Sequence, residues 1–165
     1  MQFISDGMLG KTTRWLRLLG YDVEYAPDLS DDKLIKIARD SGKILLTADL
    51  QLYRNVCQKD AKSFLLENNL SEAAKLAKLS RRFNIKLEVD VEISRCPVCN
   101  SLLREISKKE ISGKIPPESL NRYEDFWVCI KKECGKIYWQ GSHWRKITEL
   151  LKSAKRQMDI LEGKG

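Results

Sequence analysis

The chain has 165 residues, of which 42% are hydrophobic and 32% are charged, and its formal net charge is +7. This length suits one modest domain with a small appendage. It contains no run of about 18 apolar residues and no signal-peptide pattern at its start, so we expect a cytoplasmic protein with no membrane partner. The basic excess is +2 over residues 1–90 and +5 over residues 91–165, which favours a polyanionic partner for the second half.

The first half of the chain alternates short apolar runs with helical patterns. Strands are predicted at about residues 3–4, 23–26, 44–46 and 63–66. Helices are predicted at about residues 9–19, 30–42, 50–59 and 71–83, several of them bounded by capping residues and glycines. Strands that alternate with helices are typical of an α/β fold with a parallel sheet covered on both faces.

The second half has a different organisation. Alternating apolar residues from Ile85 to Ile93 predict an extended connecting strand, which leads into a cysteine-containing module. A loop is expected inside that module at residues 114–117, and an amphipathic C-terminal helix at about residues 144–161. We therefore expect an α/β domain over residues 1–90, a cysteine module over 91–145, and a C-terminal helix and tail over 146–165.

Four cysteines have the spacing of a metal site: Cys96 and Cys99 form one short pair, and Cys129 and Cys134 form a second. In a reducing compartment, two such pairs predict four thiolates around one Zn²⁺ ion, because each short turn lets two sulfurs point at the same ion. Four sulfurs leave no open position on the ion, so we expect the zinc to be structural. Cys57 is left over and is expected to be buried as a small apolar side chain.

Aspartates follow three of the predicted strands. Asp6 comes after the first strand, Asp31 and Asp32 open the helix after the second, and Asp49 comes after the third. The carboxyl ends of parallel strands meet at one edge of a sheet, so these carboxylates are predicted to converge and to bind Mg²⁺ or Mn²⁺ for phosphodiester hydrolysis. Each aspartate also has an ordinary explanation, as a turn residue or a helix cap.

Several other side chains are candidates for contact with a nucleic acid. Lys11, Arg14 and Arg17 lie at helical spacing after Asp6 and could follow a phosphate backbone, or they could form a solvated basic face. His143 is the single histidine, and it either fixes the turn into the last helix or touches substrate. The aromatic residues of the module are expected to pack beneath it or to stack on bases: Trp127, Tyr138, Trp139 and Trp144.

Five segments together resemble one family, the PIN-like ribonucleases with a C-terminal zinc ribbon, named after the C-terminal domain of the animal mutator-seven exonuclease. They are DGMLGK at residues 6–11, RWLRLLGYD at 14–22, ILLTAD at 44–49, CPVCN at 96–100 and KIYWQGSHW at 136–144. The resemblance implies a PIN-like three-layer domain with a parallel sheet, a metal-dependent ribonuclease activity and a zinc ribbon.

Carried onto this chain, the resemblance implies that Asp6, one of Asp31 and Asp32, and Asp49 are the acidic residues, with Thr47 orienting Asp49. The sequence departs from the family pattern at three places. Residues 66–69 read LENN where a further aspartate is expected, Ala48 stands where arginine is common, and four residues instead of two separate the second pair of cysteines.

Two functions of different classes follow from these observations. The first is a divalent-metal-dependent ribonuclease whose ribbon aids RNA binding. The second is a non-catalytic RNA-binding or ribosome-binding protein on the same scaffold, which the departures from the family pattern favour. The toxin of a toxin–antitoxin pair is a third possibility, and the fused ribbon argues against it.

Overall fold

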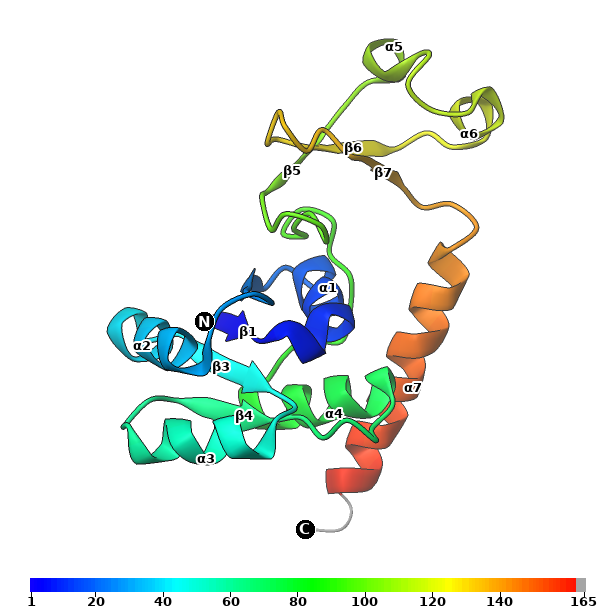
Figure 1. Ribbon diagram of the computed structural model, residues 1–165. Coiled ribbons are helices and arrows are strands. Elements are labelled where there is room, and N and C mark those ends of the chain that lie inside the picture. The colour runs from blue at the N-terminus through cyan, green and yellow to red at the C-terminus, as the bar shows by residue number, and fades with distance from the viewer. Residues whose placement is uncertain (163–165) are drawn as a thin grey trace.

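The computed structural model of the protein describes residues 1–162 and contains a parallel and an antiparallel sheet (Figure 1). The parallel sheet has four strands in the order β2-β1-β3-β4. Its strands are β1 (Gln2–Ser5), β2 (Asp22–Tyr25), β3 (Ile44–Thr47) and β4 (Ser63–Leu65). All four lie where the alternating sequence pattern predicts them, and every pairing is parallel.

Helices cover both faces of this sheet, because alternate residues of its strands point to opposite sides. The helical elements are the 3₁₀ turn η1 (Gly7–Leu9), α1 (Gly10–Leu18), α2 (Asp31–Ser41), α3 (Leu50–Gln58) and α4 (Glu72–Phe83). Phe3 of β1 packs in a core with leucines of α1 and α4, whereas its neighbour Ile4 packs with residues of α2 and α3. This arrangement confirms the three-layer α/β domain.

The segment after α4 contradicts one prediction. No strand pairing includes residues 85–93 among the residues that the structure describes, although Ile85 and Leu87 are buried in the core. The alternating pattern therefore reports which side chains face the core, while the backbone pairs with no strand. This segment also passes close over the end of α1, because a Cβ at Gly20 (φ +91°) would lie 3.0 Å from the carbonyl oxygen of Ile93.

The cysteine module forms the second sheet, with strands β5 (Leu103–Glu105), β6 (Phe126–Cys129) and β7 (Ile137–Trp139) in antiparallel order. Two short helices, α5 (Lys108–Ile111) and α6 (Pro117–Arg122), connect β5 to β6, and the loop predicted at residues 114–117 lies between them except for Pro117, which begins α6. They supply a small separate core in which Ile111 packs with Phe126.

The last helix, α7 (Trp144–Glu162), runs back along the first domain and packs on α4 (Figure 1). Leu151 and Ala154 of α7 are buried in the core on the α1 and α4 side of the sheet. The sequence predicted the helix but separated it from the first domain, and residues 163–165 of the expected tail lie outside the described residues.

Two further expectations can be compared with the structure. Cys57 is exposed on α3, so the expectation that it is a buried apolar side chain was wrong. Across the residues that the structure describes, no helix combines the length and the apolar composition needed to cross a membrane.

Candidate functional site

Asp6 and Asp49 lie at the carboxyl ends of β1 and β3, which are adjacent strands, and the hydroxyl of Thr47 connects them. The Thr47 Oγ1 donates a hydrogen bond to Asp6 Oδ2 and accepts one from the backbone N–H of Asp49 at 2.9 Å. Thr47 is fully buried and Asp6 is 6% exposed, whereas Asp49 is exposed. The structure thus places Thr47 in contact with both aspartates, which extends the expected role of orienting Asp49.

Both aspartates also cap the element that follows them. Asp6 accepts a hydrogen bond from the N–H of Met8 at 2.9 Å at the start of η1. Asp49 accepts from the N–H groups of Gln51 and Leu52 at the start of α3. Capping uses Oδ1 of each carboxylate, and the Thr47 contact uses Oδ2 of Asp6, so the ordinary explanation of both residues is also correct.

The glycines beside Asp6 allow a close approach between the loops that follow β1 and β2. A Cβ at Gly7 would lie 3.3 Å from Pro27, and one at Gly10 would lie 2.9 Å from the hydroxyl of Tyr25. Tyr25 donates a hydrogen bond to the carbonyl of Gly7 at 3.1 Å. The loop that leads to α2 therefore packs against the turn that carries Asp6.

Asp31 and Asp32 both lie in the first turn of α2 and are exposed. Asp32 forms an ion pair with Lys59, Nζ to Oδ1 2.7 Å, and the hydrogen bond from Lys59 lowers the pKa of Asp32. Lys59 follows the C-terminal end of α3, whereas Asp49 caps the N-terminal end of the same helix, so this ion pair holds Asp32 at the opposite end of α3 from Asp49.

The aspartates do not form as tight a group as the cysteines do. Within residues 1–162, the cysteines are the one set of three or more metal-ligating side chains whose ligand atoms all lie within 4.8 Å of one another. Mg²⁺ commonly takes only one or two carboxylates and completes its shell with water and phosphate oxygens, so the chemistry of Asp6 and Asp49 suits this ion.

Sequence reasoning missed two largely buried charged residues of α4. Glu72 accepts a hydrogen bond from Thr12 Oγ1 at 2.9 Å, and its Oε1 lies 3.6 Å from Lys75 Nζ. Thr12 belongs to the first turn of α1, so these contacts fix the helix start next to the Asp6 turn. Glu67, in the region where a further acid was expected, is paired with Lys78 instead. The sequence gives only a weak signal for Glu72, because acidic residues commonly follow a serine that caps a helix.

The three basic residues of α1 have different environments. Lys11 and Arg14 are exposed, as contact with a phosphate backbone requires. Arg17 is 5% exposed, and its guanidinium donates hydrogen bonds to the carbonyls of Val23, Pro97 and Val98. The prediction that Arg17 contacts RNA was therefore wrong, because α1 turns this side chain into the boundary between the two domains.

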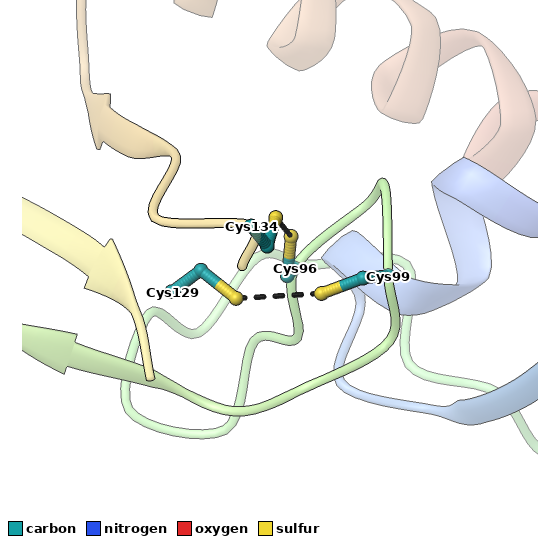
Figure 2. Close-up of side chains that lie close together, drawn as sticks. All are labelled: Cys96, Cys99, Cys129 and Cys134. Atoms are coloured by element: carbon teal, nitrogen blue, oxygen red, sulfur yellow. Dashed lines mark hydrogen bonds between the residues drawn. The ribbon is translucent and has the colours of Figure 1, made fainter. Parts of the chain in front are cut away.

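The four cysteine sulfurs meet at the point where the ribbon faces the end of α1 (Figure 2). The Sγ atoms of Cys99 and Cys129 are 3.3 Å apart, and those of Cys96 and Cys134 are 3.7 Å apart. Zn–S bonds of about 2.3 Å in a tetrahedron place sulfurs about 3.8 Å apart, so the group fits Zn²⁺. These separations are too long for disulfides, and all four cysteines are free.

The surroundings of the sulfurs favour a metal-bound state. Burial raises the pKa of Cys129 to about 12, because the buried thiolate is poorly solvated. A bound metal ion stabilises the thiolate and so displaces this proton. Burial also raises the pKa of Cys99, but hydrogen bonds from Ser101, Cys129 and Cys96 together outweigh it and bring this pKa to about 6. The hydroxyl of Tyr138 lies 3.1 Å from Cys96 Sγ, which holds one ligand in place.

A family model described as the Mut7-C RNAse domain matches residues 1–151, nearly the whole chain. The chain belongs to the Mut7-C RNAse domain family. This match confirms the family inferred from the sequence motifs, and the family description indicates a nuclease or RNA-related function. No curated protein and no solved structure matched the chain.

The aromatic residues of this Mut7-C domain surround a cavity between the ribbon, α1 and α7. Trp127 and Tyr138 are cross-strand neighbours and line a small cavity of about 90 Å³ with Leu18 of α1 and Trp144 of α7. Trp139 lines the same cavity and also packs against Phe126 of the ribbon core, with ring centroids 6.2 Å apart. All four side chains are partly buried and line this cavity, so they pack at the boundary as the first interpretation expected, and stacking on bases stays a prediction.

His143 is exposed at the start of α7. Its backbone carbonyl accepts a hydrogen bond from the N–H of Ile147, which is the first bond of the helix. The turn before α7 is closed by a hydrogen bond from the N–H of Trp144 to the carbonyl of Gly141 at 2.9 Å. His143 therefore occupies the turn into the last helix, and its side chain faces solvent.

Proposed function

We propose that this Mut7-C domain is a divalent-metal-dependent ribonuclease whose active site is the carboxyl edge of the parallel sheet. The observation that carries the proposal is the contact of Thr47 with both Asp6 and Asp49 on adjacent strands. The buried hydroxyl fixes the carboxylate of Asp6 and the backbone of Asp49, so it sets the positions of two acidic residues on adjacent strands, an arrangement suited to binding a cation. Bound Mg²⁺ or Mn²⁺ would supply an activated water and neutralise charge on the phosphate.

The chain's own residues then have separate roles. Asp6 and Asp49 would hold the cation, and Asp31 would add a carboxylate from the first turn of α2. Lys11 and Arg14, exposed on the helix that begins beside Asp6, would contact phosphates of the RNA backbone. The four-cysteine ribbon would hold structural Zn²⁺ and extend the RNA-binding surface of a chain whose second half is strongly basic.

Cleavage of single-stranded RNA tests this proposal. Asp6→Asn and Asp49→Asn remove charge with little change of shape, and each is expected to lower the Mn²⁺-dependent cleavage rate by at least about 100-fold. Asp40→Asn is the matched control, because Asp40 is an exposed aspartate at the far end of α2. Cleavage that survives both active-edge substitutions at the control rate would refute the proposal.

The second candidate is a non-catalytic protein that binds RNA, including ribosomal RNA or the ribosome. Two observations favour it. The described aspartates do not gather as closely as the cysteines, and Glu67 is paired with Lys78 where a further acid was expected. Salt-sensitive RNA binding without turnover in Mn²⁺ would select this candidate.

A further inference from the structure

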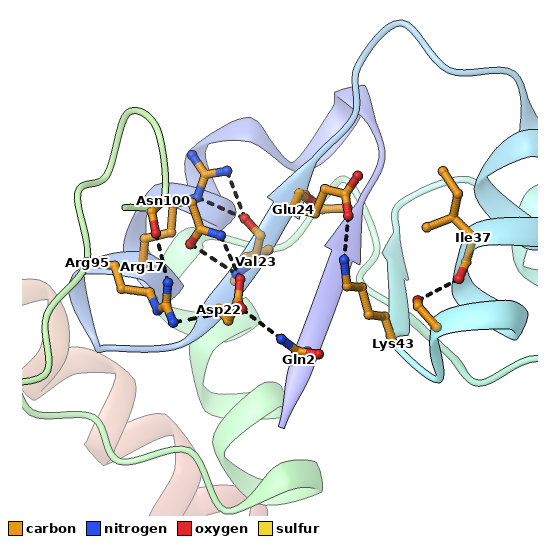
Figure 3. A network of polar contacts seen from close by, with 11 residues as sticks. Gln2, Arg17, Asp22, Val23, Glu24, Ile37, Lys43, Arg95 and Asn100 are labelled. Atoms are coloured by element: carbon orange, nitrogen blue, oxygen red, sulfur yellow. Dashed lines mark hydrogen bonds and ion pairs between the residues drawn. The ribbon is translucent and has the colours of Figure 1, made fainter. Parts of the chain in front are cut away.

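Arg17 connects the parallel-sheet domain to the cysteine ribbon, and Figure 3 shows its contact with Val23 beside those of Asn100. Its Nε and Nη2 donate to the carbonyl of Val23 on β2 at 3.0 and 2.8 Å. Its Nη1 donates to the carbonyls of Pro97 and Val98 at 3.1 and 2.9 Å. One buried guanidinium therefore spans an edge strand of the sheet and the two residues that separate Cys96 from Cys99.

A second residue of the ribbon contacts the same place on β2. The Asn100 side chain donates to Asp22 Oδ1 at 2.6 Å and accepts from the N–H of Val23 at 3.3 Å. β2 is the outer strand of the sheet, so the N–H and C=O of Val23 that face away from β1 have no strand to pair with. Arg17 and Asn100 satisfy both groups, and the first cysteine turn thereby covers the β2 edge.

The charge of the cysteine sulfurs also affects how well the buried Arg17 guanidinium is stabilised. Burial lowers the pKa of Arg17, while the negative charges of Cys96, Cys99 and Asp22 act in the opposite direction. Four thiolates around one Zn²⁺ carry a net charge of −2, which compensates a buried guanidinium better than neutral thiols do.

Metal would also fix the shape of the turn that Arg17 contacts. The turn is closed by hydrogen bonds from the N–H of Asn100 to the carbonyl of Cys96 at 2.9 Å, and from the N–H of Cys96 to the carbonyl of Ser101 at 2.8 Å. Two zinc ligands, Cys96 and Cys99, lie within it. Without the ion the turn keeps these bonds and its contacts with Arg17 and Asn100, but nothing ties its two cysteines to Cys129 and Cys134, so the carbonyls that accept from Arg17 are held less firmly.

We propose that zinc binding by the ribbon and closure of the β2 edge form one coupled equilibrium, with Arg17 as the positioning residue between them. Zinc then stabilises more than the ribbon, because the corner formed by β2 and the end of α1 opens when the ion leaves. β2 pairs with β1, which ends at the Asp6 turn, so the metal content of the ribbon reaches the proposed active edge. The coupling goes beyond the proposed ribonuclease function and does not depend on it.

Hydrogen exchange of the full chain, with zinc and after chelation, tests the coupling. Chelation is expected to speed amide exchange in β2 by roughly 100-fold, the worth of two charge-assisted hydrogen bonds of typical strength. Arg17→Met in the zinc-loaded chain is expected to do the same. Chelation of Arg17→Met should then add about tenfold or less, because only the contacts of Asn100 and Arg95 with β2 remain to be lost. Arg39→Met, an exposed arginine on α2, is the matched control and should behave as wild type.

A second variant keeps the test open if Arg17→Met does not fold. Asn100→Gly removes the side-chain contacts with β2 but suits the left-handed backbone at this position, φ +69°, so the cysteine turn should keep its shape and one zinc per chain. It is expected to speed β2 exchange about tenfold without loss of zinc. The proposal would be overturned if chelation speeds exchange of the ribbon amides while β2 exchange changes by less than twofold. It would also be overturned if chelation speeds β2 exchange in either variant by as much as it does in the wild type.

Discussion

Replacing Thr47 with valine removes the hydroxyl that joins Asp6 to Asp49 and keeps the shape of the side chain. Thr47 is fully buried, so no water can take over its donor role to Asp6. A hydrogen bond to a charged group contributes about 1.5–3 kcal/mol, and the bond from the Asp49 N–H about 1 kcal/mol more. We therefore expect the free energy of unfolding to fall by about 3 kcal/mol.

Urea unfolding followed by circular dichroism measures this loss. For a chain of this size, about 3 kcal/mol also corresponds to a melting temperature lower by roughly 6–12 °C. Thr47→Ser is the control, since it keeps the hydroxyl and loses one methyl group, at a cost of about 1 kcal/mol. If Thr47→Val proves as stable as Thr47→Ser, the hydroxyl does not make the two bonds, and the account of the carboxyl edge fails.

Three further predictions address the other parts of the molecule. Ala154→Asp places a charge in the fully buried contact between α7 and α4, so it should lower the free energy of unfolding in urea by about 3 kcal/mol or more. Arg156→Asp, at an exposed position of the same helix, is the control and should lower it little. Equal effects would show that α7 does not pack there. Zinc affinity should fall as the pH is lowered through the neutral range, because burial raises the pKa of Cys129 to about 12 and zinc must displace its proton. The fall should steepen below about pH 6, where Cys99, whose pKa is about 6, also takes up a proton. Competition with a colorimetric chelator measures this, and an affinity that does not change with pH would contradict it. Replacing Lys11 and Arg14 together with alanine should weaken single-stranded RNA binding and reduce its log–log salt slope by about 1.4, and an unchanged slope would exclude both as phosphate contacts.

Local patterns predicted the elements of the first domain well. Alternating apolar residues, capping residues and Gly42 after α2 determine short-range structure, and all four strands and the helices between them lie where expected. The same reasoning failed at residues 85–93, because burial of alternate side chains does not require a strand partner. It also missed α5 and α6, whose few residues give no clear helical period.

The candidate site shows what a sequence pattern leaves undetermined. Placement of Asp6 and Asp49 at adjacent strand ends follows from topology, so it could be predicted. The role of Arg17 could not, because helical spacing groups it with Lys11 and Arg14, while its burial depends on where the ribbon lies 80 residues later in the chain. The cysteine site was predictable because ligand spacing alone nearly determines it.

The central claim is that Asp6 and Asp49 bind a catalytic cation at the carboxyl edge. Crystals soaked with Mn²⁺ test it most directly, since anomalous scattering locates the ion. The account predicts a peak between the two carboxylates that disappears in Asp6→Asn, next to an unaffected zinc peak at the four cysteines. A zinc peak alone, with no manganese at the carboxyl edge of the wild-type protein, would contradict the account.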